Sequence, residues 1–79
     1  MKINLLAFGI AKDILGKTEQ EFEWSGGDIN ALKSHLLENY PAFQKLQSLR
    51  LAVNQEYRSD DFGIKDGDEV AIIPPVSGG

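Results

Sequence analysis

A chain of 79 residues forms one domain, because a chain this short removes only roughly 60–65% of its unfolded surface from water on folding. Hydrophobic residues make up 42% and charged residues 25% of the sequence, which is typical of a folded globular protein and not of a disordered one. The net charge of −4 has the wrong sign for a protein that binds nucleic acid or an anionic membrane. We therefore expect a single domain over residues 1–79 whose partners are proteins.

Cysteine is absent from the sequence, which excludes disulfides, thiolate metal sites and a cysteine nucleophile. Small secreted domains usually depend on disulfides, so the cytoplasm is the expected compartment. No apolar run approaches the ~20 residues of a membrane span, and the apolar start of the chain is too short for the core of a signal peptide. We expect a cytoplasmic protein that contacts neither membrane nor nucleic acid.

Residues 2–24 are predicted to form two strands joined by a long loop. Residues 2–8 are largely apolar at both the odd and the even positions. This pattern indicates a central strand that packs against other parts of the protein on both of its faces. Residues 9–17 have the composition of a short helical turn. Residues 18–24 alternate three glutamates with Phe22 and Trp24, as a half-exposed strand does. A solvated face is the favoured interpretation of the glutamates, with an acidic binding face as the alternative.

The main helix is predicted to begin at Asp28, which follows a break at residues 25–27 and is well placed to cap the first turn. Apolar residues then recur at spacings of three and four until Pro41 ends the pattern. This stripe, which should cover one face of a sheet, consists of Ile29, Leu32, Leu36 and Tyr40.

The rest of the chain predicts one irregular turn and three further strands. Residues 42–48 form the turn, residues 49–53 a third strand, and residues 54–57 a turn that leads into a brief fourth strand. Residues 66–68 form a tight turn before the last strand at residues 69–73. One main helix on a mixed sheet makes this an α+β domain, and the ubiquitin-like β-grasp is the expected fold. A ferredoxin-like βαββαβ arrangement is the alternative, but it needs a second full helix.

Strand parity predicts an interaction surface. The helix is expected to cover Ile3, Leu5, Val70 and Ile72. Parity then places Phe8, Ala71 and Ile73 on the opposite sheet face, where an exposed apolar patch indicates an interface. The expected partner-binding anchors are Phe8, Ile73 and Tyr57, with Lys12 at the rim. Ordinary scattered apolar surface residues are the alternative.

Three other features are interpreted as structural. His35 is the only histidine and has no companion ligand, so a helix-surface residue is favoured over a catalytic or metal-binding one. The acidic residues at 60–69 lack the spacing of a calcium loop, which favours turn chemistry. Gly26-Gly27 lacks both the G-x-G-x-x-G pattern and a Walker lysine, so it is predicted to be a simple loop. We expect no metal or cofactor to bind this chain.

The C-terminal residues carry the clearest indication of chemistry. Pro74 and Pro75 cannot donate to a ladder, so the last strand ends there and the chain leaves as an extended tail. Gly78 and Gly79 have no side chains, so they can pass through a narrow channel. The Gly79 carboxylate is an anion at neutral pH that can attack the α-phosphate of ATP, and it becomes an acyl donor once adenylated. A frayed terminus is the alternative.

Three segments resemble the MoaD/ThiS family of ubiquitin-like sulfur carriers: residues 52–55 (AVNQ), residues 66–71 (DGDEVA) and above all residues 74–79 (PPVSGG). The resemblance spans nearly the whole chain, and the Pro-Pro-x-x-Gly-Gly ending is its most specific part. Thiamine-type carriers usually lack the Pro-Pro context, so the resemblance is strongest to the molybdopterin branch of the family. Lys12 departs from the family pattern, because the family often has arginine at this position. A bidentate contact to a partner would be weaker with lysine than with arginine.

The resemblance implies a cycle of partners. An E1-like adenylyltransferase would use ATP and magnesium to form an acyl-adenylate on Gly79, and a sulfur donor of the cysteine desulfurase or rhodanese type would convert it to a thiocarboxylate. The tail would then enter the large subunit of molybdopterin synthase, in a heterotetramer of two small and two large subunits, and deliver sulfur to cyclic pyranopterin monophosphate. The residues that thread into that subunit would be Pro74, Pro75, Val76, Ser77 and Gly78.

On this interpretation the chain is a sulfur donor and not an enzyme on its own, because the catalytic groups belong to its partners. Two alternatives stay open. The chain could be a thiamine-pathway or other ubiquitin-like sulfur carrier or protein modifier, or it could be a ubiquitin-like docking module without chemistry.

Overall fold

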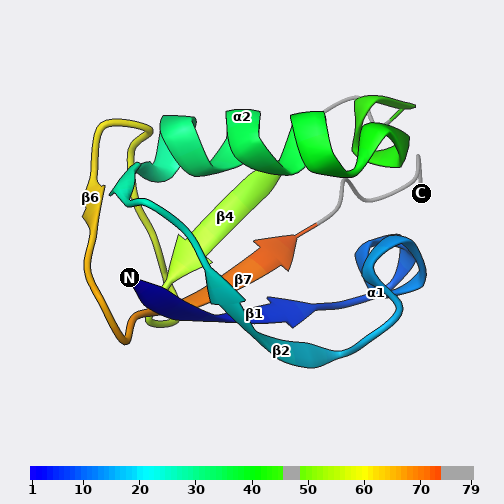
Figure 1. Cartoon of the computed structure of the whole chain (residues 1–79), viewed down its shortest axis with the longest axis horizontal. Coiled ribbons are helices and arrows are strands. Elements are labelled where there is room, and N and C mark those ends of the chain that lie inside the picture. Colours follow the sequence, from blue (N-terminus) through cyan, green and yellow to red (C-terminus); the bar gives the residue numbers. More distant parts are fainter. Residues whose placement is uncertain (46–48, 74–79) are drawn as a thin grey trace.

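The computed structural model describes residues 1–45 and 49–73, and it confirms the predicted β-grasp arrangement of one main helix on a mixed sheet (Figure 1). The main sheet has the strand order β2-β1-β7-β4-β5. Inside it, β1 (Lys2–Ala7) is antiparallel to β2 (Glu19–Glu23) and parallel to β7 (Glu69–Ile73). β4 (Arg50–Val53) and β5 (Glu56–Tyr57) form an antiparallel hairpin on the other side of β7.

The main helix, α2 (Ile29–Asn39), begins and ends where the sequence predicts. Asp28 is its N-cap, and its carboxylate accepts a hydrogen bond from the Ala31 N–H at 2.8 Å, a contact that typically contributes about 1 kcal/mol. The helix ends before Pro41, which opens the 3₁₀ helix η1 (Pro41–Lys45) in the segment predicted as an irregular turn. Residues 46–48 of that predicted turn lie outside the described residues.

A shorter helix, α1 (Ile10–Leu15), lies in the connection between β1 and β2, where the sequence predicts a helical turn. It ends at Gly16, whose backbone has the left-handed φ of 83° and whose N–H donates to the Lys12 carbonyl at 2.7 Å. A positive φ at this position favours glycine, because a Cβ would clash with the backbone. The predicted helical turn is therefore confirmed and extends to six residues.

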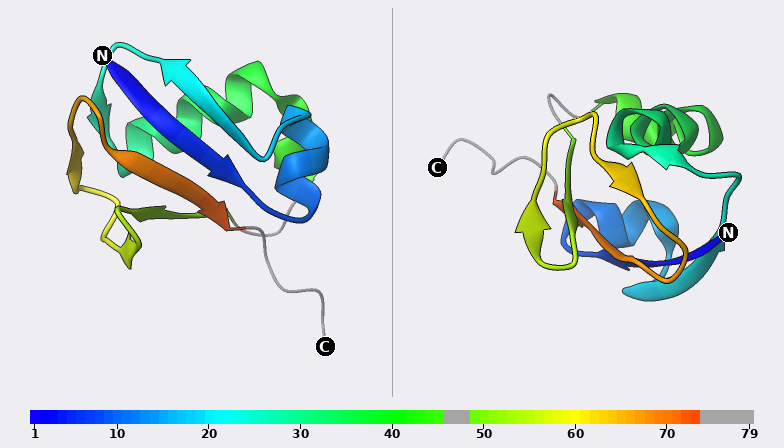
Figure 2. Two further views of the ribbon diagram at one scale, coloured as in Figure 1. Left: turned by 90° about the horizontal axis from the view of Figure 1, so that it is seen from below. Right: turned by 90° about the vertical axis from the view of Figure 1, so that its left-hand side faces the viewer.

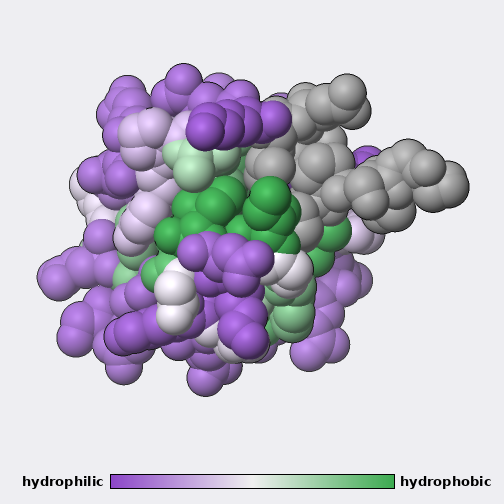
Figure 3. Space-filling view, turned by 90° about the vertical axis from the view of Figure 1, so that its right-hand side faces the viewer, coloured by the Kyte–Doolittle hydropathy of each residue, from purple (hydrophilic) through white to green (hydrophobic). Residues whose placement is uncertain are grey.

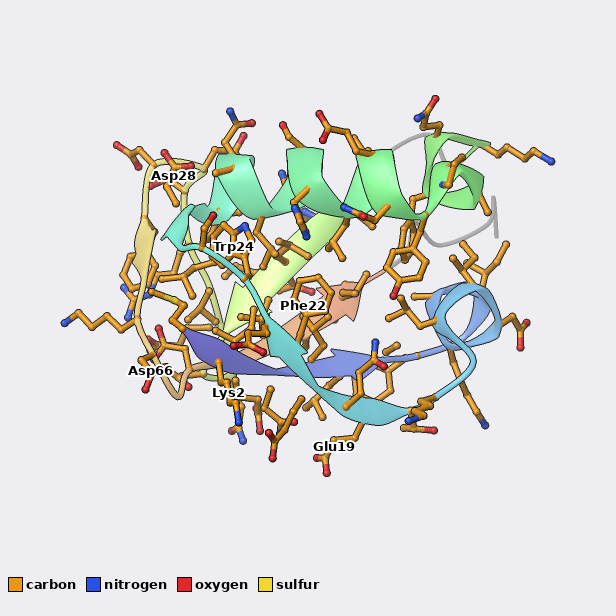
Figure 4. All side chains as sticks on the ribbon, in the orientation of Figure 1. Lys2, Glu19, Phe22, Trp24, Asp28 and Asp66 are labelled. Atoms are coloured by element: carbon orange, nitrogen blue, oxygen red, sulfur yellow. The ribbon has the colours of Figure 1, made fainter. Side chains whose placement is uncertain are left out.

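The core lies between α2 and one face of the main sheet, as strand parity predicts. The side chains of Phe22 in β2 and of Trp24, which follows this strand, point toward α2 (Figure 4). The four sheet residues that the helix was expected to cover are all at most 2% exposed. The largest fully enclosed side chains of the core combine them with three residues of the helix stripe and with Val53 and Phe43, and are Ile3, Leu5, Ile29, Leu32, Leu36, Phe43, Val53, Val70 and Ile72.

Three features on the core side of the molecule were not predicted. β3 (Gly27–Asp28) pairs antiparallel with β6 (Gly63–Ile64) in a separate two-stranded sheet, because strands of two residues leave no alternation to detect. Phe43 in η1 is 1% exposed and belongs to the core. His35 is half-buried instead of lying openly on the helix surface, and its ring meets Phe22 edge-on with centroids 5.5 Å apart.

Of the two turns predicted between the later strands, the one at residues 66–68 is confirmed, whereas the one predicted at residues 54–57 is limited to residues 54–55, because Glu56–Tyr57 already form β5. Asn54 and Gln55 have φ values of 51° and 70°, the left-handed backbone that suits a tight two-residue hairpin between β4 and β5. The turn at residues 66–68 is held from both sides: the Asp66 carboxylate accepts from the Lys2 N–H at 2.7 Å, and the Gly67 N–H donates to the Lys2 carbonyl at 2.7 Å. Within residues 1–45 and 49–73, no helix is long and apolar enough to cross a membrane.

Candidate functional site: the open sheet face and the carrier terminus

The sheet face opposite α2 carries a row of mainly apolar side chains that crosses four strands. Leu6 of β1 pairs with Ala71 of β7, which pairs with Ala52 of β4, which in turn pairs with Tyr57 of β5. None of these four residues belongs to the core cluster between the sheet and α2. Ala71 and Ala52 are nevertheless only 9% and 7% exposed, so the prediction that Ala71 forms part of an exposed patch is wrong, while Leu6 is half-buried and Tyr57 is exposed. The left view of Figure 2 shows this face in front, with α2 behind the sheet. We call this row and its neighbours the open sheet face.

Two of the predicted anchors, Phe8 and Ile73, lie at the end of this face where the described chain stops. Ala7 pairs with Ile72 across the parallel strands, so the next residues, Phe8 and Ile73, are at the same level of the sheet. Phe8 is 47% exposed and Ile73 is half-buried. Both residues thus follow a paired position at the same end of the sheet, where residues 74–79 begin. Their role as anchors for a partner stays a prediction.

Tyr57, the third predicted anchor, lies at the far edge of the open sheet face and is 61% exposed. The guanidinium carbon of Arg50 is 5.1 Å from the centroid of the Tyr57 ring, which is within the range of a cation–π contact. Arg50 was not among the predicted partner-binding residues, although the alternation of residues 49–53 places it on the same face as Ala52. Arg50 also pairs with Ile73 across β4 and β7, so it links two of the predicted anchors.

Lys12, the predicted rim residue, is exposed on α1. This helix follows β1 and lies at the end of the molecule where β1 ends. Figure 3 shows this end, where apolar side chains gather around α1. Ile10 on this helix is 48% exposed, while Ile14 and Leu15 are partly buried against the core. Ile10 was missed as a surface residue, because six helical residues are too few to show which side faces outward.

The other half of the open sheet face is polar. The three glutamates of β2 are all exposed, as both the predicted solvated face and the alternative acidic binding face require. The Lys2 ammonium lies 3.9 Å from the Glu21 carboxylate, and the Asn4 amide donates to the Glu19 carboxylate at 3.4 Å. Both contacts are exposed, and surface pairs of this kind contribute little to stability. The face therefore divides into an apolar half near Ile73 and an acidic half along β2.

The predicted tail-threading residues 74–78 and the reactive Gly79 lie outside the described residues. The part of the chain that positions them is described: β7 runs through the centre of the sheet and ends at Ile73. Elsewhere in residues 1–45 and 49–73, no group of three His, Asp or Glu side chains is placed to hold a metal ion. The chemistry predicted for the tail stays a prediction from its sequence.

Comparison with known proteins places the chain in a family. Residues 5–79 match the model of the ThiS family. The chain belongs to this family. Among its relatives, the molybdopterin synthase sulfur carrier subunit of Caenorhabditis elegans is 40% identical over 83 residues, which cover 100% of this chain and 99% of the relative.

Two solved structures extend the likeness of this ThiS-family chain to three dimensions. The putative molybdopterin converting factor subunit 1 of Pyrococcus furiosus is 27% identical with a TM-score of 0.83, over 96% of this chain and 99% of that chain. A protein–protein complex of subunits 1 and 2 of the molybdopterin-converting factor of Helicobacter pylori contains a chain that is 25% identical, with a TM-score of 0.67 over 100% of both chains. The resemblance noted in the sequence is confirmed.

Proposed function

We propose that this chain is the sulfur carrier subunit of a molybdopterin synthase. The observation that carries the proposal is the full-length match to the Caenorhabditis elegans sulfur carrier subunit, at 40% identity. The Pro-Pro-Val-Ser-Gly-Gly ending of the sequence supports it, because a terminal carboxylate on two glycines is unhindered toward attack. The chain is then a substrate-like subunit that is charged and discharged by partners, and it catalyses no step by itself.

The chemistry takes place on the carboxylate of Gly79. A carboxylate oxygen attacks the α-phosphate of ATP, pyrophosphate leaves, and an acyl-adenylate forms on an E1-like adenylyltransferase that holds the ATP and magnesium. The persulfide sulfur of a desulfurase- or rhodanese-type donor then attacks the carbonyl carbon, AMP leaves with the bridging oxygen, and a thiol reduces the resulting acyl disulfide to release the thiocarboxylate. Activation is needed because a free carboxylate is inert as an acyl donor. The product is a thiocarboxylate, whose sulfur is transferred to cyclic pyranopterin monophosphate in the large subunit.

The large subunit of the synthase is the proposed partner of the open sheet face. The Helicobacter pylori structure is a complex of subunits 1 and 2 of the converting factor, which supports a lasting association of the two subunits. An exposed apolar surface beside the start of the tail suits this role, because docking there directs residues 74–79 toward the partner. Phe8, Ile73 and Tyr57 would provide the apolar anchors, with Arg50 and Lys12 at the polar rim.

Intact-mass measurement tests the proposed function. We expect the chain, incubated with an E1-like adenylyltransferase, ATP, magnesium and sulfide, to gain about 16 Da, because sulfur replaces one carboxylate oxygen. The charged chain, mixed with a molybdopterin synthase large subunit and cyclic pyranopterin monophosphate, should return to its original mass as molybdopterin forms. Charging without molybdopterin formation would indicate a carrier of another pathway, such as the thiamine pathway. No mass change would indicate a docking module without chemistry.

Substitutions on the open sheet face separate docking from folding. We expect Phe8→Ala and Ile73→Ala each to weaken binding to the large subunit by about 1–3 kcal/mol, in the range of interface anchors. Their effect on the stability of the isolated domain should be smaller, because Phe8 is 47% exposed and Ile73 is only half-buried. Titration calorimetry and urea denaturation measure the two quantities on the same proteins.

Leu5→Ala is the matched control, because Leu5 lies on the core face of the same sheet and is 1% exposed. It should lower the free energy of unfolding by roughly 2–5 kcal/mol and leave the affinity of the folded molecules unchanged. The interface assignment is wrong if Phe8→Ala and Ile73→Ala behave like Leu5→Ala in both measurements.

A further inference from the structure

The outer edge of β2 is the longest free sheet edge in the part of the chain that the structure describes. β2 lies at one end of the strand order and pairs with β1 alone, whereas β5 at the other end has two residues. Along the β1–β2 ladder, Met1 and Trp24 exchange both backbone hydrogen bonds, at 2.9 and 3.0 Å. The Ala7 N–H donates to the Thr18 carbonyl at 2.8 Å. These bonds establish which residues of β2 direct their backbone N–H and C=O groups toward β1.

Hydrogen-bonded pairs alternate with non-hydrogen-bonded pairs along an antiparallel ladder. The backbones of Trp24 and Thr18 are hydrogen-bonded to the β1 side of the ladder. Phe22 lies two residues before Trp24 and Gln20 two residues after Thr18, so their backbone groups also point toward β1. The N–H and C=O groups of the three residues between them then point away from the sheet. Those three residues are Glu19, Glu21 and Glu23. A further strand could therefore add to β2 through six backbone groups.

The two sides of this edge differ in chemistry. On the open-face side, the three glutamate side chains are exposed, and Figure 4 shows Glu19 pointing away from α2. On the helix side, Phe22 and Gln20 are half-buried, and the ring of Phe22 packs against His35 of α2. An added strand would thus meet carboxylates with one set of alternating side chains and an aromatic surface with the other.

Charge decides what can occupy the edge. A second copy of this chain would bring three more glutamates against the same face, and like charges on neighbouring strands are destabilising. Charged residues on an edge strand are a common protection against such self-pairing. A segment with Lys or Arg at alternate positions would instead place opposite charges across the new ladder. Apolar residues between them would face Phe22 and His35.

We propose that the β2 edge binds an extended segment of a partner protein by strand addition, and that this segment alternates basic with apolar residues. The binding is independent of the apolar half of the open sheet face and of Gly79. It can therefore be tested on the full chain without the adenylyltransferase or the large subunit.

The probe is a capped peptide of alternating lysine and valine, titrated into the nitrogen-15-labelled full chain. We expect saturable binding that shifts the amide signals of Glu19, Glu21 and Glu23 and slows the hydrogen exchange of these amides. Affinity should fall as salt is added, because the charge pairs are exposed. A peptide of alternating glutamate and valine should not bind. Binding of both peptides, no binding of either, or shifts centred on the apolar half of the open sheet face near Ile73 would overturn the proposal.

Two substitutions at Glu21 separate the backbone contribution from the charge. Glu21→Pro removes an N–H that has no partner in the sheet, at an edge position where proline is tolerated, and should weaken binding by about tenfold. Glu21→Gln keeps the N–H and should weaken binding by about two- to fivefold at low salt. Glu38→Gln, which removes an equal charge from the exposed surface of α2, is the matched control and should bind like the parent.

Unchanged affinity of Glu21→Pro would overturn strand addition. If Glu21→Pro does not give the spectrum of a folded protein, the same hydrogen bonds can be removed from the other side. A lysine–valine peptide that is N-methylated at alternate residues loses its donors to the edge, and it should then bind the parent chain at least about tenfold more weakly. Equal affinity of the methylated peptide would contradict the proposal.

Discussion

Deletion of Gly79 is expected to abolish thiocarboxylate formation and to leave the melting temperature of the domain unchanged. The shortened chain still ends in a glycine carboxylate, that of Gly78, so the reacting group itself is retained. Its reach is shorter by about 3.3–3.6 Å, the span of one extended residue. Activation requires the carboxylate oxygen to approach phosphorus within about 3–3.5 Å in a defined direction, so a shortfall of one residue prevents the reaction. Intact mass after incubation with adenylyltransferase, ATP and sulfide measures the loss.

Stability should not change, because Gly79 has no side chain to bury and, among the residues that the structure describes, the core cluster lies within residues 3–72. Extension by one alanine after Gly79 should have the same effect as the deletion, since it moves the free carboxylate away from position 79. Ser77→Ala is the matched control, because it keeps the length of the chain and the Gly-Gly end, and it should be charged like the parent. If the shortened chain still accepted sulfur, the mechanism through the Gly79 terminus would be wrong.

Leu36→Ala is expected to cause a large loss of stability, of the size expected for Leu5→Ala. Leu36 is 0% exposed in the middle of α2, between the helix and the sheet. Removal of a fully buried leucine side chain costs roughly 2–5 kcal/mol, because the lost burial adds to the cavity left behind. The free energy of unfolding of a domain is typically only about 5–15 kcal/mol. The variant should therefore unfold at a much lower urea concentration, while the dependence of its unfolding free energy on urea concentration stays the same.

Glu38→Ala provides the matched comparison, because Glu38 is exposed on the same helix. It should change the free energy of unfolding by less than about 0.5 kcal/mol. A Leu36→Ala variant as stable as Glu38→Ala would show that the apolar stripe of α2 does not face the sheet.

The elements that could be predicted from the sequence are those determined by nearby residues. The Asp28 cap and the apolar stripe of α2 depend on residues within a few turns of each other, so their pattern is visible in the sequence. The core face of β1 and β7 follows from alternation once the helix is assigned to one side. The exposed glutamates of β2 follow from alternation in the same way.

The features that were missed depend on contacts between distant segments. The contact of His35 with Phe22 joins α2 to β2, and the contact of Arg50 with Tyr57 crosses a hairpin whose register the sequence does not specify. The pairing of β3 with β6 joins residues 27–28 to residues 63–64 through only two residues on each side. The chemistry of Gly79 was predicted from the position of this residue in the sequence. The proposal is supported by that position and by the membership of the chain in the family.

The parallel pairing of β1 and β7 has a practical consequence for attaching labels to this protein. Asn4 pairs with Glu69 and Ala7 with Ile72, so Met1 and Ile73 lie at opposite ends of the sheet, as the positions of β1 and β7 in Figure 1 show. A fluorophore or affinity handle fused before Met1 would sit far from the point where the chain leaves the sheet. The same handle fused after Gly79 would convert the reactive carboxylate into an amide. Immobilisation through the N-terminus therefore leaves the acyl end free for capture and release by its enzymes.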